Sequence, residues 1–150
     1  MRIALYQPDI PQNCGTILRL AACFQVGVDI VEPCGFLFDD RRFKRAGMDY
    51  LDSVDIQKHA SWEHFLEASK DQRLVLATTK ATDLHYEFSF REKDILLMGQ
   101  ESAGVPDDVS EQCHKKVKIP MSPHCRSLNV AVSTGIILGE ALRQTNCFPV

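Results

Sequence analysis

The sequence contains no long hydrophobic run. After Arg2, the apolar stretch at residues 3–6 ends at Gln7 and Pro8. It is too short for the core of a signal peptide, and no segment reaches the roughly 18 apolar residues that a membrane span requires. We therefore expect a cytoplasmic protein without a membrane anchor.

The sequence also lacks any C-x-x-C pair among its six cysteines. Two cysteines have a histidine neighbour, Cys113 beside His114 and Cys125 beside His124. Adjacent residues rarely ligate one tetrahedral ion together, and the usual short ligand spacings are missing. We therefore predict free, reduced thiols and no metal site.

Three glycine motifs are absent as well. The chain has no G-x-G-x-x-G, no G-x-x-x-x-G-K-[ST] and no G-x-S-x-G. These absences argue against a nicotinamide-dependent oxidoreductase, a P-loop protein and an α/β-hydrolase. The formal net charge of −3 gives no global sign of a nucleic-acid binder, so any RNA contact requires a local basic patch.

The composition is that of one globular domain. Its 150 residues are 45% hydrophobic and 25% charged, and no repeat or linker divides residues 1–150. Short apolar runs alternate with amphipathic segments, which predicts an α/β fold with a largely parallel sheet flanked by helices. Strands are expected at residues 2–6, 28–32, 54–58, 73–79, 95–98 and 117–119, and helices at 13–25, 40–46, 62–68 and 128–144.

Polar residues mark where these helices should begin. Asn13, Asp39 and Ser61 are expected N-caps, because their side-chain oxygens can accept from free backbone N–H groups of the first turn. Gly47 is expected to end the second helix.

The last expected helix carries small residues at every fourth position, namely Ala131, Gly135 and Gly139. Each glycine inside a helix costs roughly 0.8–1 kcal/mol relative to alanine, so a close approach of another backbone should offset it. Two explanations remain open: tight packing on the protein's own sheet, or a helix-to-helix contact in a homodimer.

Three polar loops follow predicted strands, at residues 13–19, 99–106 and 119–129. Ligands bind at the carboxyl ends of the strands in open α/β sheets, so these loops should form one site. Glycine-rich loops without a phosphate fingerprint suit a ligand that needs close approach of the backbone.

The motifs in these loops resemble those of the SpoU branch of the SPOUT RNA methyltransferases. They read Asn13-x-Gly15-x-x-x-Arg19, Gly99-x-Glu101-x-x-Gly104-x-Pro106, and Ile119-Pro120-Met121 followed by Arg126-Ser127-Leu128-Asn129. They occur in the family's order and spacing over essentially the whole chain. Segments at residues 32–36, 45–50, 78–80 and 140–144 resemble the minimal-length members that methylate the wobble ribose of tRNA.

The resemblance implies a trefoil knot in the C-terminal third and S-adenosylmethionine as the methyl donor. The cofactor-binding positions that it implies are Ala77, Thr78, Gly99, Glu101, Ile119, Ser127 and Leu128. Three positions depart from the common family pattern: Thr16 in place of asparagine, Cys125 in place of serine and Gly139 in place of tyrosine.

The catalytic residues implied by the resemblance are Arg19, Asn13, Glu101, Ser127 and Asn129. Arginine stays protonated in proteins, so we expect Arg19 to hold a phosphate next to the reacting ribose rather than to act as a base. Glu101 is expected either to orient Arg19 or to bind the donor, with a purely structural loop role as the alternative. Ser127 and Asn129 are equally able to cap the last helix.

A basic cluster follows the second strand. Arg41, Arg42, Lys44 and Arg45 are expected to contact RNA phosphates, together with Arg126, although a solvated helix face is the alternative. The sequence thus predicts transfer of a methyl group to the ribose 2′-hydroxyl of a tRNA nucleotide, the wobble pyrimidine in the first place. A ribosomal RNA target and a non-catalytic RNA-binding module are the alternatives, and a homodimer through the last helix is expected.

Overall fold

The computed structural model describes residues 1–45 and 49–150, which form one sheet with helices on both faces. Within these ranges the sheet has seven strands in the order β3-β2-β1-β6-β4-β7-β5, and each neighbouring pair is parallel. This arrangement confirms the predicted α/β class with a parallel sheet. The strands are β1 (Arg2–Tyr6), β2 (Gly27–Val31), β3 (Ile56–His59), β4 (Leu74–Ala77), β5 (Asp83–Leu84), β6 (Ile95–Met98) and β7 (Lys115–Lys118).

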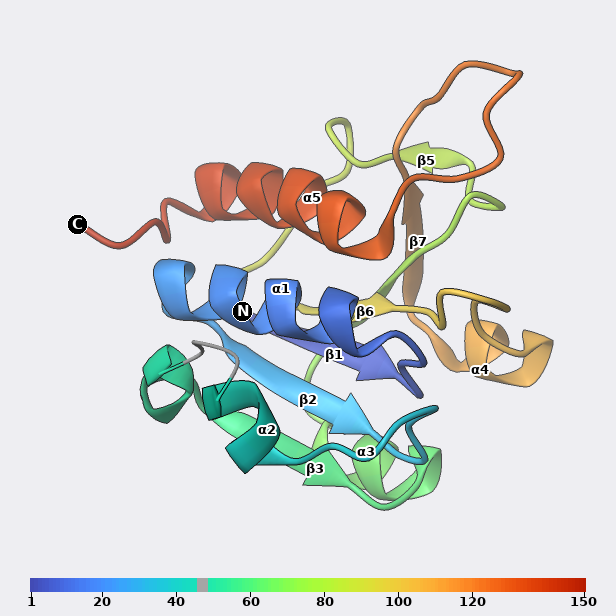
Figure 1. Cartoon of the computed structure of the whole chain (residues 1–150). Helices are drawn as coiled ribbons and strands as arrows, with labels where there is room; N and C mark the ends of the chain where they lie inside the picture. The colour runs from blue at the N-terminus through green and yellow to red at the C-terminus, as the bar shows by residue number, and fades with distance from the viewer. Residues whose placement is uncertain (46–48) are drawn as a thin grey trace.

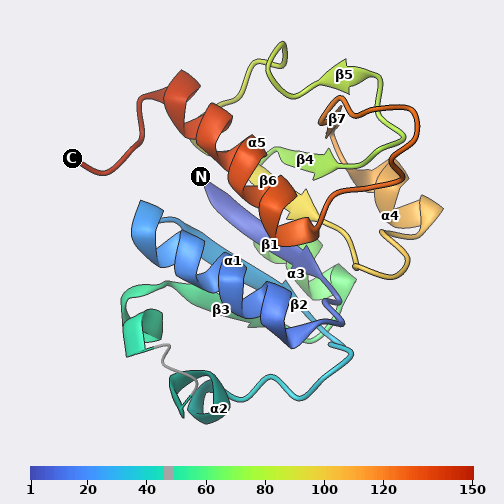
Figure 2. The same cartoon turned by 45° about the horizontal axis from the view of Figure 1, so that its top comes forward.

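The helices form two layers. Helices α1 and α5 lie side by side on one face of the sheet, and α3 lies on the other (Figures 1 and 2). The bounds are α1 (Pro11–Phe24), α2 (Asp40–Arg45), α3 (Trp62–Ala68), α4 (Asp107–Gln112), α5 (Val130–Thr145) and a 3-10 helix, η1 (Asp49–Ser53). No helix within the described ranges is both long enough and apolar enough to cross a membrane.

Alternating strand residues supply the two halves of the core. In β1, Ile3 and Leu5 pack in the cluster that contains residues of α1 and α5. Ala4 and Tyr6 point to the opposite cluster, which contains Trp62 of α3. Side chains of a strand alternate between faces, so a strand covered on both sides is apolar along its buried length, as residues 3–6 of β1 and the whole of β6 are.

Two helix starts differ from the sequence prediction. Asn13 is not the N-cap of α1, because the helix begins at Pro11 with Ile10 in the capping position. Proline suits the first helical position, where its missing N–H is not needed. Asn13 therefore sits inside the first turn with its side chain available for other contacts. The last helix begins at Val130 rather than at residue 128, and Asn129 is its N-cap.

The other expected caps are present. Ser61 accepts a hydrogen bond from the backbone N–H of His64 at 3.2 Å. Asp39 accepts from the backbone N–H of Arg41 at 2.9 Å. The helix end expected at Gly47 lies outside the described residues. Elements that the sequence did not predict are β5, α4 and η1, which are two, six and five residues long.

Packing within the chain does not cover the whole row of small residues on α5, which consists of Ala131, Gly135 and Gly139. A Cβ atom on Gly135 would stand 3.9 Å from Leu20 of α1, an ordinary contact distance, and one on Gly139 would have no described neighbour within 4 Å. The neighbouring Val132 and Ile136 are 51% and 40% exposed. The protein's own sheet therefore does not account for the glycine at position 139.

Candidate active site

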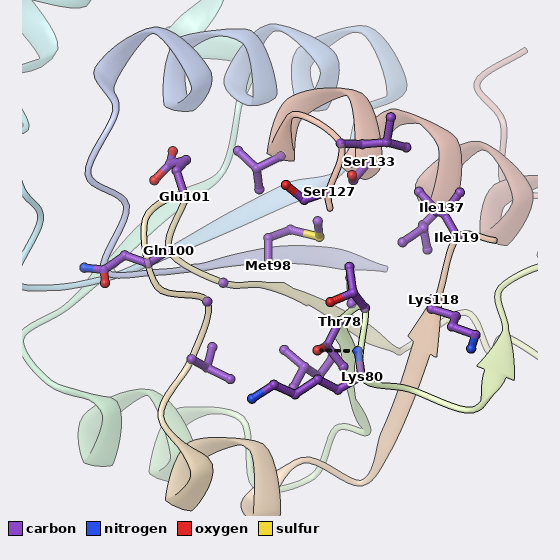
Figure 3. A pocket seen from close by; sticks show the side chains of 18 of the residues that line it. Thr78, Lys80, Met98, Gln100, Glu101, Lys118, Ile119, Ser127, Ser133 and Ile137 are labelled. Carbon is purple, nitrogen blue, oxygen red and sulfur yellow. Dashed lines mark hydrogen bonds between the residues drawn. The ribbon is translucent and has the colours of Figure 1, made fainter. Parts of the chain in front are cut away.

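A hollow of about 530 Å³ opens where β4, β6 and β7 end (Figure 3). Met98 lies at its centre, with Thr78 and Lys80 on one side and Ser127 and Ser133 on the α5 side. Parallel strands all end at the same edge of the sheet, so their following loops converge there. Residues of the predicted loops 99–106 and 119–129 meet at this first hollow. Residues 13–19 belong to α1 instead of forming a loop, and of these only Asn13 lines the first hollow.

The first hollow contains every residue that the resemblance implied for the cofactor. Its lining includes Ala77, Thr78, Gly99, Glu101, Ile119, Ser127 and Leu128. It also includes Asn13 and Asn129, two of the expected catalytic residues, and Gly104 of the second motif. A small-molecule site has a typical volume of about 300–1,000 Å³, so the hollow has the size for a nucleoside-like ligand.

The loop after β6 is shaped by its two glycines. Gln100 and Gly104 exchange backbone hydrogen bonds of 2.9 and 2.8 Å, which closes a tight turn. A Cβ atom on Gly99 would stand 2.8 Å from the Cα of Gly104, too close for any side chain. Gly104 has a φ of +66°, a conformation that glycine adopts without strain. Both glycines therefore keep the backbone of this loop free to face the hollow.

Asn13 joins two of the loops. The side-chain amide of Asn129 donates to the side-chain oxygen of Asn13 at 2.9 Å, and the Asn13 amide donates to Glu101 at 3.5 Å. Asn129 at the same time accepts from the backbone N–H groups of Ala131 and Val132 at 2.8 and 3.2 Å. Asn129 thus combines the capping role with a place in the site. The cap is formed by Asn129, and Ser127 lines the hollow without a capping bond in the described structure.

Asp9 was not predicted from the sequence, yet it is the nearest partner of Glu101. Its backbone N–H donates to Glu101 at 2.9 Å, and its carboxylate accepts from the hydroxyl of Ser102. A Cβ atom on Gly35 would stand 2.6 Å from the Cβ of Asp9, so the absence of a side chain at Gly35 allows the loop after β2 to pack closely against Asp9. The position of Asp9 two residues before the proline of α1 gave no signal in the sequence.

The two carboxyl groups affect each other's protonation. Burial raises the pKa of Glu101, and the neighbouring Asp9 raises that pKa further. The hydrogen bond with Glu101 and the one from Ser102 lower the pKa of Asp9. When two carboxyl groups share a site, one of them holds its proton to a higher pH. Of the two carboxyl groups, Glu101 therefore keeps its proton to the higher pH, and its other oxygen accepts the hydrogen bond from Asn13.

Arg19 does not lie in the first hollow. It lines a second hollow of about 470 Å³ on the other side of α1, where its guanidinium stands 5.6 Å from the ring centroid of Tyr50. The expectation that Glu101 orients Arg19 is not met within this chain, since the described bonds of Glu101 go to Asp9 and Asn13. The side chains of Asn13 and Arg19 project from different sides of α1. Glu101 lies on the side of Asn13 and is therefore separated from Arg19 by the helix.

The expected RNA-binding residues are spread over two places. Arg41 and Arg42 are exposed on α2, and Arg126 is exposed beside Ser127 on the loop before α5. Lys44 and Arg45 belong to α2, but their side chains are not among those that the structure describes, so the expectation for these two stays a prediction. Lys80 and Lys118, which sequence reasoning did not single out as site residues, line the first hollow and add positive charge there (Figure 3). In the described parts of the chain no three His, Cys, Asp or Glu side chains are grouped to hold a metal ion.

The chain is similar to known methyltransferases along nearly its full length. The model of the SpoU rRNA Methylase family matches residues 1–139. A tRNA (cytidine(34)-2′-O)-methyltransferase of Beijerinckia indica is 56% identical over 144 residues, covering 95% of this chain and 90% of the relative.

Two solved structures share the fold. One, from work on the 2-OH methylation of C/U34 on tRNA, has a TM-score of 0.89 and 42% identity, with 95% of this chain and 94% of the other covered. The SpoU methyltransferase AviRb from Streptomyces viridochromogenes in complex with AdoMet has a TM-score of 0.86 and 25% identity, and the match covers 96% of this chain and 57% of the other.

Proposed function

Because the chain belongs to the SpoU rRNA Methylase family, we propose that it methylates the ribose 2′-hydroxyl of the wobble pyrimidine of tRNA, with S-adenosylmethionine as the donor. The observation that carries the proposal is a set of hydrogen bonds that joins the three predicted motifs at one site. The loop residues that line the first hollow are joined by the bonds of Asn13 to Asn129 and Glu101. The knot implied by the resemblance is part of the same family pattern and stays a prediction.

The residues of the first hollow fit the donor. The loops at Gly99–Gly104 and 119–128 offer backbone groups, and Leu76, Met98 and Ile137 offer an apolar floor. This combination of an apolar wall with a few polar groups is typical of a cofactor site. S-adenosylmethionine, when bound, supplies a methyl group activated by the neighbouring sulfonium.

The chain's own contribution is alignment of the hydroxyl. Transfer to a hydroxyl is an in-line displacement, and correct positioning is worth effective molarities on the order of 10⁵–10⁸ M. We assign the positioning of the ribose to Asn13, Ser127 and Asn129, with Glu101 holding Asn13 in place. The hydroxyl proton passes to a phosphate oxygen or to water, since Arg19 cannot accept it.

Arg19 is proposed to hold a phosphate of the substrate. It is exposed, carries a permanent positive charge and lines the second hollow. It acts next to the reacting ribose only if the RNA spans both hollows or a second protomer supplies it. Arg41, Arg42 and Arg126 are proposed to add phosphate contacts, which give affinity without sequence preference.

We infer that the protein works as a homodimer through α5. Val132 and Ile136 expose apolar surface on one face of this helix, and the space beside Gly139 is open. Apolar side chains next to a stripe without side chains suit the close approach of a second helix. A tRNA substrate would place this dimer in the cytoplasm.

The test is transfer of a labelled methyl group from S-adenosylmethionine to bulk tRNA, followed by nuclease digestion and mass spectrometry. The expected product is a 2′-O-methylated pyrimidine nucleotide from the wobble position. Transfer only to ribosomal RNA would overturn the proposed substrate. No transfer to any RNA, with RNA still bound, would reduce the protein to a binding module.

A further inference from the structure

The second hollow lies across α1 from the first and shares that helix with it. Asn13 lines the first hollow, whereas Thr16 and Arg19 line the second. The second hollow measures about 470 Å³ and is closed on its far side by Phe36, Leu37, Arg42, Phe43 and, from η1, Tyr50. A strand of RNA that crosses the N-terminal half of α1 would therefore meet both hollows.

The far wall of the second hollow is aromatic and apolar. The rings of Phe36 and Phe43 meet edge to face, with centroids 6.4 Å apart and planes at 73°. Both rings are half-buried and pack against the core, so their positions are fixed from behind. Leu37 beside them is 74% exposed. Fixed ring surfaces that remain open to solvent are the surfaces on which unpaired bases stack.

Two guanidinium groups complete the second hollow. Arg19 lines it from α1 and Arg42 from α2, and both are exposed. No acidic side chain is among the described residues that line it, and neither guanidinium has an ion-pair partner in the described parts of the chain. In a chain of net charge −3, this is a local excess of positive charge. Such a place attracts a phosphate, which arginine can bind with two parallel hydrogen bonds.

We propose that the second hollow binds one nucleotide that flanks the methylated one in the same RNA, with the base against Phe36, Leu37 and Phe43 and the phosphate at Arg42. This assignment rests on the proposed function, because it takes the RNA as the substrate. A base held here selects substrates by the loop sequence next to the target, and a ring wall with one exposed leucine accepts a flat, apolar face better than a charged peptide.

Removal of a single base tests the assignment. RNA anticodon stem-loops are made with one abasic nucleotide at each loop position in turn, and their Kd values are measured by fluorescence anisotropy with the full-length protein. The variant is Leu37→Ser, whose side chain is 74% exposed and outside the core. Phe36→Leu serves as a second variant, and Arg41→Gln is the matched control, since Arg41 is exposed on the same short helix but does not line the hollow.

For the wild type, an abasic nucleotide at one position other than the target should weaken binding by about 5- to 150-fold, as expected for one stacked base. Leu37→Ser and Phe36→Leu should weaken binding of the intact RNA and should largely remove the penalty at that same position. Arg41→Gln, which removes a proposed phosphate contact outside the hollow, should weaken binding of every RNA by a similar factor and should retain the full penalty at that position. Equal penalties in the wild type and both hollow variants at every position would overturn the assignment.

A change in the dimer dissociation constant of Leu37→Ser, without a change in RNA binding, would also overturn the assignment, because a second copy would then occupy the hollow. The failure of the proposed function looks different. In that case no methyl group is transferred to any RNA. The dependence of Kd on the position of the abasic nucleotide is measured without methyl transfer, so it tests the second hollow independently.

Discussion

The side chains of Asn13 and Asn129 meet at 2.9 Å across 116 residues of sequence, with the amide of Asn129 donating to the oxygen of Asn13. This bond ties the first turn of α1 to the start of α5. The acceptor oxygen of Asn129 is at the same time engaged by the first N–H groups of α5. One residue therefore sets both where the helix begins and how the site is oriented.

The two roles of Asn129 can be separated by substitution. Asn129→Asp keeps the oxygen that caps α5 but removes the N–H that reaches Asn13, so we expect unchanged thermal stability and a methyl-transfer kcat reduced about 10- to 100-fold through misalignment. Asn129→Ala removes the cap as well and should cost about 1 kcal/mol of stability in addition. A kcat for Asn129→Asp equal to that of the wild type would show that Asn129 is only a cap.

Stability should depend on pH with opposite signs at Asp9 and Glu101. The pKa of Glu101 is raised by burial and by Asp9, so the stability that its proton contributes is present below its unfolded pKa and is lost as the pH rises through the folded pKa. Glu101→Gln, which cannot ionise, should therefore have a higher Tm than the wild type at neutral pH. This advantage should shrink as the pH falls.

Asp9→Asn provides the opposing comparison. The pKa of Asp9 is lowered by its hydrogen bonds with Glu101 and Ser102, so its contribution is present above its unfolded pKa and is lost as the pH falls through the folded pKa. Asp9→Asn should lower Tm at neutral pH and approach the wild type at acidic pH. Scanning fluorimetry between pH 3 and 8 measures both, and parallel Tm curves for all three proteins would refute the coupling.

The glycines of the loop after β6 give a matched pair for cofactor binding. Gly99→Ala places a methyl group 2.8 Å from the Gly104 backbone and forces the loop to move, at a cost of about 1–3 kcal/mol in stability. Isothermal titration should show the affinity for S-adenosylmethionine reduced at least about tenfold, a loss of about 1.4 kcal/mol.

Gly104→Ala meets no atom within 4 Å among the described residues, and only its positive φ costs about 1–2 kcal/mol. It should fold less stably while binding the donor more tightly than Gly99→Ala does. The reverse order of affinities would mean that the close approach of the two glycines does not shape the cofactor site.

The dimer is tested on the exposed face of α5. Ile136→Glu places a charge on a side chain that is 40% exposed, next to Val132, and should shift sedimentation equilibrium at micromolar concentration from dimer to monomer. Leu37→Glu is the matched control, because Leu37 is more exposed but lies away from α5, and it should leave the dimer intact. A wild-type protein that sediments as a monomer at this concentration would contradict the proposed dimer.

The sequence predicted the layers and the site better than it predicted the contacts. Runs such as Ile95–Met98 are apolar throughout, because the sheet is covered on both faces, and this pattern is readable without a structure. The loops at Gly99 and Ser127 could be assigned to one edge of the sheet by the same logic. Short elements such as β5 and α4 could not, since two to six residues carry too little periodicity.

The partners within the site depended on three-dimensional detail. Asn13 follows a proline-marked loop, which favoured a cap in sequence terms, but Pro11 starts the helix earlier and moves Asn13 into the site. The pairing of Asp9 with Glu101 joins positions 92 residues apart. Arg19 lies in a separate hollow because its side chain projects from the other side of α1 than that of Asn13. A sequence motif does not show which pocket each side of a helix faces.

The most direct test of ribose methylation uses two tRNA transcripts that differ in one oxygen atom. One carries cytidine at the wobble position and the other carries 2′-deoxycytidine there, and both receive the wild-type protein with labelled S-adenosylmethionine. Methylation of the wobble ribose predicts one methyl group per molecule on the first transcript and none above background on the second. Equal labelling of both would show that the methyl group goes to a base or to another nucleotide, and would contradict ribose 2′-hydroxyl methylation at the wobble position.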